Sequence, residues 1–146
     1  MLTAKDFFSK QEQIDIVCAI RDAETQTSGE VRVHIEDNCP QETLDRAASV
    51  FETLELHKTA QRNSILFYLS VQDHKFAVIG DAGINLLVPE HFWEEIRDKV
   101  LKYFSAKQYS KGLVEGITIA GNKLREFFPY QENDINELPD EISFGD

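Results

Sequence analysis

Three short segments of this 146-residue chain combine acidic or amide side chains with small, turn-forming residues. Carboxylate and amide oxygens are the ligands that hard cations such as Ca²⁺ and Mg²⁺ take in proteins, and glycine lets a backbone carbonyl turn toward an ion. Such residues could form a divalent-cation site if the fold brought them together. The segments are Ser28-Gly29-Glu30, Arg62-Asn63 and Gly80-Asp81-Ala82-Gly83, with Asn85 just beyond the third.

The same side chains also have a purely structural interpretation. Glu30 can pair with Arg62 or Arg32, and Asp81 can cap a turn. Acidic clusters on protein surfaces commonly do no more than this, because structural ion pairs also gather charges. Composition alone therefore favours the structural alternative.

A second group of oxygen-bearing side chains is a weaker candidate site. Asp and Asn are ordinary turn residues, so a structural role is favoured more strongly here. His34 alternates with apolar residues and is predicted to lie on the surface. The four histidines show no paired zinc spacing, and the chain has no glycine-rich phosphate loop. The group comprises Glu36, Asp37, Asn38, Gln72, Asp73 and His74.

The most apolar part of the chain predicts the centre of a β-sheet. Residues 64–71 and 75–80 hold two apolar runs joined by a short polar break, which indicates a buried hairpin. Residues 30–36 alternate apolar and polar side chains, which indicates a strand with one buried and one wetter face. A helix over 43–57 then implies a right-handed crossover between two parallel strands. The starts of these two strands and the end of the third share one edge, where the three polar segments should meet.

Four helices are predicted to cover this sheet. Ser9 and Glu12 have the spacing of a capping box, which starts a helix over 10–25. Pro89 suits the first turn of a later helix. Three glycines in the last helix, over 109–128, cost about 1 kcal/mol each relative to Ala, which is tolerable where a helix packs closely on its neighbour. The predicted inward-facing residues are Ile14, Val17 and Cys18, then Leu44, Ala47, Ala48, Phe51 and Leu54, then Phe92, Ile96, Val100 and Phe104, and last Leu113, Ile117, Ala120 and Leu124.

This order of elements predicts an α/β fold, a three-layer α/β/α sandwich in which helices cover both faces of a small mixed sheet. The length suits one domain, predicted over residues 1–130. Residues 131–146 contain six acidic residues and no basic one, and form a predicted acidic C-terminal tail. The tail is expected to be partly ordered because its apolar residues can pack on the body. These are Ile135, Leu138, Ile142 and Phe144.

The net charge of −11 limits the partners that the chain can bind. It opposes nucleic acid and anionic membrane surfaces, which need clustered Lys and Arg. No apolar stretch is long enough to span a bilayer, and the N-terminal residues lack the apolar core of a signal peptide. The sequence therefore predicts no membrane insertion and a cytoplasmic location.

Several segments together resemble the TPM domain family, in its short stand-alone bacterial branch. They are Ser-Gly-Glu-Val-Arg-Val at 28–33, Ile-Gly-Asp-Ala-Gly-Ile at 79–84, Tyr-Ser-Lys-Gly-Leu-Val-Glu-Gly-Ile at 109–117, Phe-Phe-Pro-Tyr at 127–130 and Asn-Glu-Leu-Pro-Asp-Glu-Ile at 136–142. The resemblance implies an α/β/α sandwich. It also implies divalent-ion binding, seen in related domains, and an acid phosphatase activity described for a plant thylakoid member that is linked to photosystem II repair.

The family's motifs fall on the three polar segments of this chain. Its Thr-Gly-x-Glu-type segment falls on residues 28–30, its strand-leading Asn-Gly falls on Asn63-Ser64, and its Gly-x-Gly-Leu-Glu loop falls on residues 80–84. The common loop ends in Glu, whereas the acid here is Asp81, inside the loop. Many members also have a signal peptide and a C-terminal membrane segment or glycine-rich tail, which this sequence does not show.

Three functions follow from these residues and this resemblance. The first is a divalent-cation domain for Ca²⁺ or Mg²⁺, with Glu30 and Asp81 as carboxylate ligands and Asn63 and Asn85 as carbonyl ligands. The second is a metal-assisted hydrolase of a small phosphorylated substrate, in which the ion polarises phosphate and activates water. The third is a non-catalytic module for protein assembly or repair that binds a protein partner, with aromatic residues near the C-terminus as a docking surface. These aromatics are Phe127, Phe128, Tyr130 and Phe144.

Overall fold

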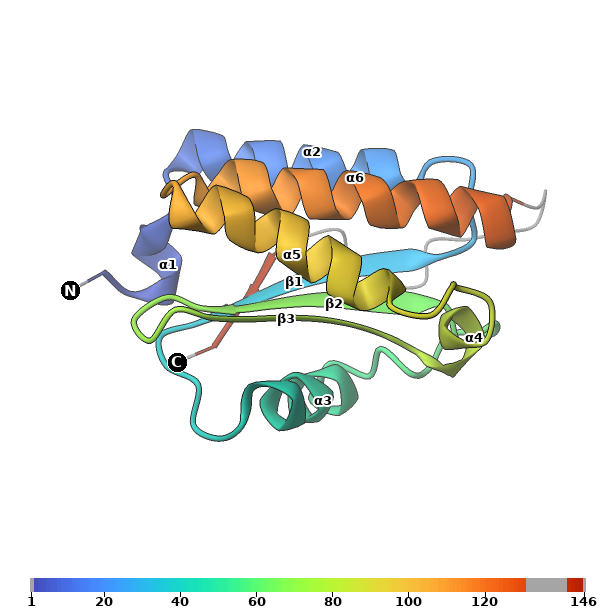
Figure 1. The fold of residues 1–146 in the computed structure, drawn as a ribbon, viewed down its shortest axis with the longest axis horizontal. Helices are drawn as coiled ribbons and strands as arrows, with labels where there is room; N and C mark the ends of the chain where they lie inside the picture. Colours follow the sequence, from blue (N-terminus) through green and yellow to red (C-terminus); the bar gives the residue numbers. More distant parts are fainter. Residues whose placement is uncertain (1, 131–141, 146) are drawn as a thin grey trace.

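A computed structural model describes residues 2–130 and 142–145 of the chain (Figure 1). Helices α2, α5 and α6 lie on one face of a mixed sheet, and α3 lies on the other face. The three-layer α/β/α sandwich predicted from the sequence is confirmed. The elements are α1 (Ala4–Phe7), α2 (Lys10–Glu24), β1 (Glu30–Glu36), α3 (Thr43–Thr53), β2 (Ser64–Ser70), β3 (Lys75–Gly80), α4 (Ala82–Asn85), α5 (Phe92–Ser105), α6 (Tyr109–Phe127) and β4 (Ile142–Phe144).

The four strands lie in the order β3-β2-β1-β4. β1 and β2 are parallel, with Glu30 opposite Ser64, and the α3 crossover joins them as predicted. β3 returns antiparallel to β2, with Gly80 opposite Ile65. β4 was not predicted as a strand; it pairs parallel to β1 and its Ile142 is buried in the core. Ile135 and Leu138, the other predicted anchors, lie outside the described residues.

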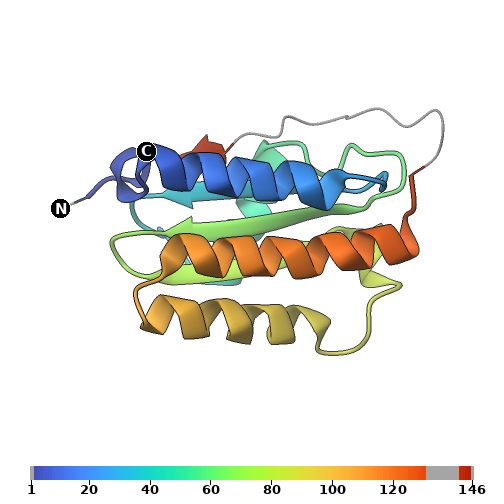
Figure 2. The same cartoon turned by 90° about the horizontal axis from the view of Figure 1, so that it is seen from above.

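The core consists of two layers, one on each face of the sheet. The larger layer fills the space between the sheet and the three long helices, which lie side by side over it (Figure 2). Its centre includes Ile16, Phe67 and Ile117. The smaller layer lies under α3 and includes Phe51 and Tyr68. Successive residues of β2 alternate between these layers, because side chains of a strand point to opposite faces in turn.

Strand β1 differs from its prediction because both of its faces are buried. Its polar residues share the α3 side of the sheet and expose 9% of their surface or less. β1 is an inner strand between β2 and β4, and the expected wetter face is missing. These polar residues are Glu30, Arg32, His34 and Glu36.

The apolar face predicted for the first helix is wrong for Ile14 and Cys18, whereas Val17 packs against the core as predicted. α2 buries Ile16, Ala19, Ile20 and Ala23, whereas Cys18 is exposed. Both sets of residues have helical spacing, and packing against α6 selects the set that includes the small Ala19 and Ala23. The capping box between Ser9 and Glu12 is present as predicted.

Two connections also differ from the prediction. α3 ends at Thr53 rather than residue 57, because Glu55 takes a left-handed φ of 60° that a helix cannot continue. Leu44, predicted to face inward on this helix, is 56% exposed. The expected flexible link at residues 80–83 instead leads into the short helix α4, which Asp81 caps.

Within the part of the chain that the structure describes, no helix combines the length and apolar character needed to cross a bilayer.

Close packing of α6 on α2 gives a test of the predicted role of glycine. A Cβ atom at Gly121 would lie 2.7 Å from both Cα and Cβ of Ala23. We expect Gly121→Ala to lower the free energy of unfolding by about 1–3 kcal/mol through overpacking, even though Ala is favoured over Gly by about 1 kcal/mol in an open helix. Urea unfolding checks this, with Thr118→Ala on the exposed side of α6 as the control. An increase in stability for Gly121→Ala would show that the two helices move apart at little cost.

Candidate functional site

The fold brings the predicted carboxylates to one end of the sheet, where β1 and β2 begin and β3 finishes. Glu30 opens β1 opposite Ser64 of β2, and the backbone N–H of Asp81 donates to the Ser64 carbonyl at 2.9 Å. Glu30 and Asp81 therefore flank Ser64 from its two neighbouring strands. Both carboxylates are largely buried, with 3% and 6% of their residues exposed. We call this place, made by Glu30, Asn63, Ser64 and Asp81, the acidic edge.

Arg62 neutralises Asp81 at this edge. Its Nε and Nη2 atoms each donate to one carboxylate oxygen of Asp81 at 2.7 Å. These hydrogen bonds and the carboxylate charge raise the pKa of Arg62. Asp81 Oδ1 also accepts from the Ala82 N–H as it caps α4. The arginine side chain remains about half exposed, at 51%, whereas the Asp81 side chain is 6% exposed.

A close backbone approach positions this ion pair. A Cβ atom at Gly83 would lie 2.0 Å from the Gln61 carbonyl oxygen and 2.6 Å from that of Arg62, so only glycine fits. The Arg62 carbonyl accepts from Gly83 N at 2.8 Å and from Ile84 N at 3.3 Å. The loop before β2 is thereby held against the loop after β3.

The two predicted amide ligands point to different neighbours. Asn63 is 1% exposed, and its Nδ2 donates to Ser28 Oγ at 3.2 Å. Asn85 donates from Nδ2 to the Gly80 carbonyl at 2.9 Å and accepts at Oδ1 from Trp93 Nε1 at 2.8 Å. Asn63 thus joins the acidic edge to the segment before β1, whereas Asn85 ties the end of β3 to α5.

The donor atoms at the acidic edge match a hard cation better than a transition metal. No group of three or more His, Cys, Asp or Glu side chains in residues 2–130 and 142–145 is arranged to hold a metal. The edge instead combines two carboxylates with amide and hydroxyl oxygens. Ser64 Oγ is buried and has no hydrogen-bond partner among the described residues. Oxygen donors of this kind suit Ca²⁺ and Mg²⁺.

The opposite edge of the sheet holds a closed polar network around Glu36. Arg46 donates to Glu36 from Nε at 3.0 Å and also from Nη2, and the Tyr68 hydroxyl donates at 2.6 Å. His34 Nε2 lies 3.4 Å from Glu36 Oε1, and its Nδ1 lies 2.7 Å from Ser143 Oγ. His34 is 7% exposed, so its predicted surface position is wrong.

The remaining residues of this second predicted group hold loops together. Asp37 Oδ1 accepts from Ala4 N at 2.6 Å, and Asp73 Oδ2 accepts from Cys39 N at 2.9 Å. Asn38 donates to Gln72 Oε1 at 3.1 Å. These are the structural roles that the turn chemistry of Asp and Asn favoured.

Sequence reasoning missed Arg46, Tyr68 and Ser143 in the Glu36 network. A signal for one of them existed, because Tyr68 is the polar-tipped residue inside an apolar strand and lies opposite His34 in the parallel register. Ser143 reaches His34 only because β4 adds to β1, which the sequence did not predict.

Burial and hydrogen bonds set the charges of this network. Burial lowers the pKa of His34, although Glu36 opposes this. Burial alone would raise the pKa of Glu36, but the hydrogen bonds from Arg46 and Tyr68 outweigh it and leave the pKa lowered. Burial and the Glu36 carboxylate raise the pKa of Tyr68. At neutral pH the network therefore joins a carboxylate, a guanidinium, a neutral imidazole and a neutral phenol.

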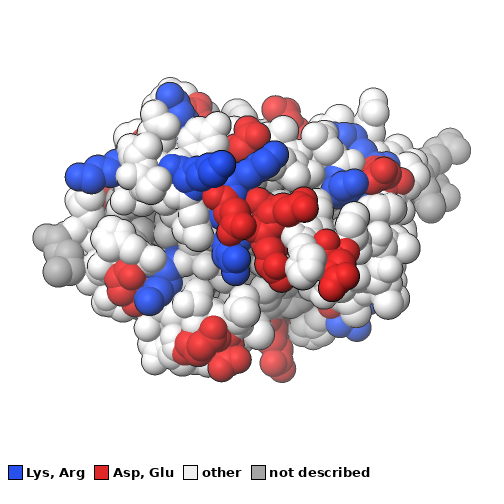
Figure 3. All heavy atoms as spheres, in the orientation of Figure 1, with Lys and Arg blue, Asp and Glu red and all other residues white. Residues whose placement is uncertain are grey.

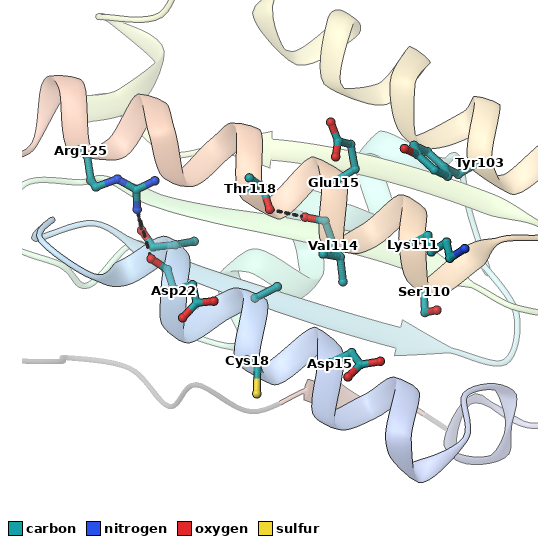
Figure 4. Close-up of a pocket in the computed structure, with 12 residues that line it drawn as sticks. Asp15, Cys18, Asp22, Tyr103, Ser110, Lys111, Val114, Glu115, Thr118 and Arg125 are labelled. Carbon is teal, nitrogen blue, oxygen red and sulfur yellow. Dashed lines mark hydrogen bonds between the residues drawn. The ribbon is translucent and has the colours of Figure 1, made fainter.

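A separate hollow of about 520 Å³ lies between α2 and α6 (Figure 4). Arg125 lies at one end and donates from Nη1 to the Asp22 and Ala23 carbonyls, so it caps the C-terminus of α2. Cys18 borders the hollow from α2, and Lys111 borders it from α6. None of the four predicted cation ligands lines it.

The fold defines this chain as a small α/β/α sandwich with acidic and amide loops at one sheet edge. The family model of the TPM domain matches residues 2–123, and the chain belongs to the TPM domain family. A search of curated proteins finds no match.

Solved structures agree with this assignment. The chain is 41% identical to the BA42 protein of the psychrophilic bacterium Bizionia argentinensis, with a TM-score of 0.90, over 99% of this chain and 100% of that one. The N-terminal domain of a protein from P. gingivalis matches at 15% identity and a TM-score of 0.69, over 86% of this chain and 83% of that one. The N-terminal domain of the cg2496 protein of Corynebacterium glutamicum matches at 8% identity and a TM-score of 0.66, over 89% and 81%. The last two likenesses show the fold alone.

The lowered pKa of His34 predicts how the free energy of unfolding depends on pH. Because the pKa of His34 is lowered on folding, the unfolded chain takes up this proton first, so stability falls as the pH drops below about 6.5. We expect His34→Gln to flatten the fall between about pH 7.5 and pH 5, and to cost about 1–2 kcal/mol at the higher pH through lost hydrogen bonds. Urea unfolding at several pH values measures both effects.

Thr118→Ala on the exposed side of α6 gives the control, because it removes no ionisable group, and its stability should depend on pH as in the wild type. Equal slopes for the wild type and His34→Gln would show that the pKa of His34 is the same in the folded and unfolded protein, and would contradict the prediction.

Proposed function

We propose that this TPM domain binds a divalent cation, Ca²⁺ or Mg²⁺, at the acidic edge, and that Arg62 is the built-in cation that the metal displaces. The observation that supports this most directly is the placement of Glu30 and Asp81 on the two sides of Ser64, both largely buried. Buried carboxylates need a compensating positive charge. Arg62 now supplies it to Asp81 from a half-exposed position.

Exchange of Arg62 for a metal ion is reasonable because about half of the arginine side chain is exposed to water. Water competes for the half-exposed guanidinium of Arg62, and a long side chain must be ordered to hold the pair. A divalent ion brings twice the charge into the same place. The displaced guanidinium can extend into water without leaving a buried charge behind.

The ligands in this proposal are the carboxylates of Glu30 and Asp81, the side-chain carbonyl of Asn63 and the Ser64 hydroxyl. Asn85, the fourth residue predicted from the sequence, can take part only if its Oδ1 releases Trp93 Nε1. Water would complete the coordination, as is usual for Mg²⁺ and common for Ca²⁺. The bound ion would supply positive charge at the acidic edge and fix the orientation of its ligands.

Phosphate ester hydrolysis has less support than cation binding. A phosphate group needs basic side chains. The basic residues closest in sequence to Glu30 and Asn63 are Arg32 and Arg62. Arg62 is paired with Asp81, and Arg32 is 9% exposed. We therefore favour a domain that binds a cation without catalysis. The cytoplasmic location and the lack of nucleic-acid binding stay predictions from composition.

Two substitutions with opposite effects test the proposal. We expect Asp81→Asn to weaken Ca²⁺ or Mg²⁺ binding by at least about tenfold, because it removes a carboxylate ligand and still caps α4. We expect Arg62→Gln to strengthen binding, because it removes the competing cation. Calorimetric titration of each ion into the purified protein measures both changes.

Arg97→Gln, at an exposed arginine on α5, serves as the control and should bind like the wild type. Heat equal to dilution in the wild type and in Arg62→Gln alike would refute the cation site. Hydrolysis of a chromogenic phosphate ester that Asp81→Asn abolishes in the folded protein would instead favour the hydrolase.

A further inference from the structure

The outer edge of β3 leaves backbone groups exposed. β3 is the last strand on its side of the sheet, and the Asp81 N–H points inward to Ser64. In an antiparallel pair, successive residues point their backbone groups alternately inward and outward. The register places Ser64 opposite Asp81, so Ile79 and Ala77 also point inward, whereas Gly80, Val78 and Phe76 point outward.

The Asn85 side chain confirms this alternation of inward and outward groups, and it occupies the Gly80 end of the exposed β3 edge. Its Nδ2 atom donates to the Gly80 carbonyl, which is an outward-pointing group. The Trp93 indole in turn donates to Asn85 and lies against Gly80, where a Cβ atom would be 2.3 Å from its ring. The outward N–H and C=O groups of Phe76 and Val78 have no hydrogen bond that joins them to another described segment.

This edge forms the floor of a groove of about 450 Å³ between two helices. α3 supplies one wall with the half-exposed Leu44 and with Glu42 at its N-terminal cap. α5 supplies the other wall with Trp93 and Glu94. Each wall therefore pairs one apolar side chain with one carboxylate, on either side of a row of backbone donors and acceptors.

The shape of the groove favours a single extended segment. Phe76, Ala77 and Val78 are 9%, 3% and 5% exposed although they belong to an edge strand, because the two helices cover both of their faces. A second copy of this chain would bring its own flanking helices toward α3 and α5. A bare peptide strand meets no such obstacle, and its side chains would point alternately to the two walls.

The charge of the groove defines the kind of peptide. Its ionisable side chains are Glu42 and Glu94, with Arg97 as the one cation in the described lining, and the whole chain has a net charge of −11. Figure 3 shows this side of the molecule, where acidic and basic side chains lie together over the middle. A complementary strand would have Lys or Arg beside apolar residues.

We propose that the groove between α3 and α5 binds an extended, basic and apolar peptide segment of a partner protein, which pairs with the open edge of β3 as an added strand. Backbone hydrogen bonds to Phe76 and Val78 hold the segment. The apolar side chains of the segment face one wall, where they contact Leu44 or Trp93, and its basic side chains face the carboxylate of the opposite wall, Glu94 or Glu42. The site is distinct from the acidic edge, so it does not depend on cation binding.

Trp93 is the only tryptophan of the chain and reports on the groove. The probe is the peptide acetyl-Lys-Val-Thr-Val-Thr-Val-Lys-amide, added to the intact protein. We expect a saturable change in Trp93 fluorescence, with NMR shifts and slowed hydrogen exchange at the Phe76 and Val78 amides. N-methylation of the valines alone should leave binding intact, because the other peptide edge can still pair. N-methylation of all five internal residues should abolish it.

Two matched leucine substitutions test the role of the α3 wall in peptide binding. Leu44→Lys places a positive charge in the groove and should weaken peptide binding by at least about tenfold. Leu86→Lys, at a leucine 85% exposed and outside the groove lining, should leave binding unchanged. Replacement of both peptide lysines by glutamate should also weaken binding.

Three outcomes would overturn the proposal. The first is no saturable change with the unmodified peptide. The second is equal binding of the fully N-methylated peptide, which would mean that charge alone attracts it to the acidic surface. The third is a wild-type dimer in sedimentation equilibrium that Leu44→Lys dissociates, which would assign the edge to a second copy of this chain.

Discussion

The parallel pairing of β1 with β2 is the constraint on which the rest of this structure depends. Its register sets Glu30 opposite Ser64 at one end and Glu36 opposite Ser70 at the other. The hairpin to β3 then returns Asp81 to the first end. Polar groups that are distant in the sequence therefore gather at the two ends of these strands. A slip of one residue would send every side chain of β1 to the opposite face.

Buried carboxylates have different kinds of partner at the two polar ends of the sheet. At the Glu36 end, Arg46, Tyr68 and His34 surround one carboxylate, and Ser143 of β4 completes the network. Such a network specifies one arrangement because each lost partner leaves a buried group unsatisfied. At the acidic edge, one half-exposed arginine holds Asp81. The first end is therefore a closed network, whereas the carboxylate of Asp81 at the second end relies on one arginine side chain.

The α3 side of the sheet is covered by a single helix, and this asymmetry has consequences for function. Three long helices seal the other face, where most of the core lies. α3 is short because the chain turns at Glu55. Its Leu44, in the first turn, is exposed and lines the groove beside β3. The groove against α5 follows from that placement. Asn85 and Trp93 close only its Gly80 end, where they also border the loop that contains Asp81.

Sequence patterns were enough to predict most helices and strands, because periods of two and of 3.6 residues and the turn chemistry of Gly, Pro and Asp are local properties. They predicted the hairpin, the crossover, the sandwich and the shared edge of Glu30 and Asp81. Tertiary packing selects the buried face of α2, places His34 inside and pairs Arg62 with Asp81. These choices depend on contacts between residues far apart in the chain, and several partners satisfy the same local pattern. The added strand β4 is the clearest case, since three residues contain too little periodicity to predict a strand without β1 beside them.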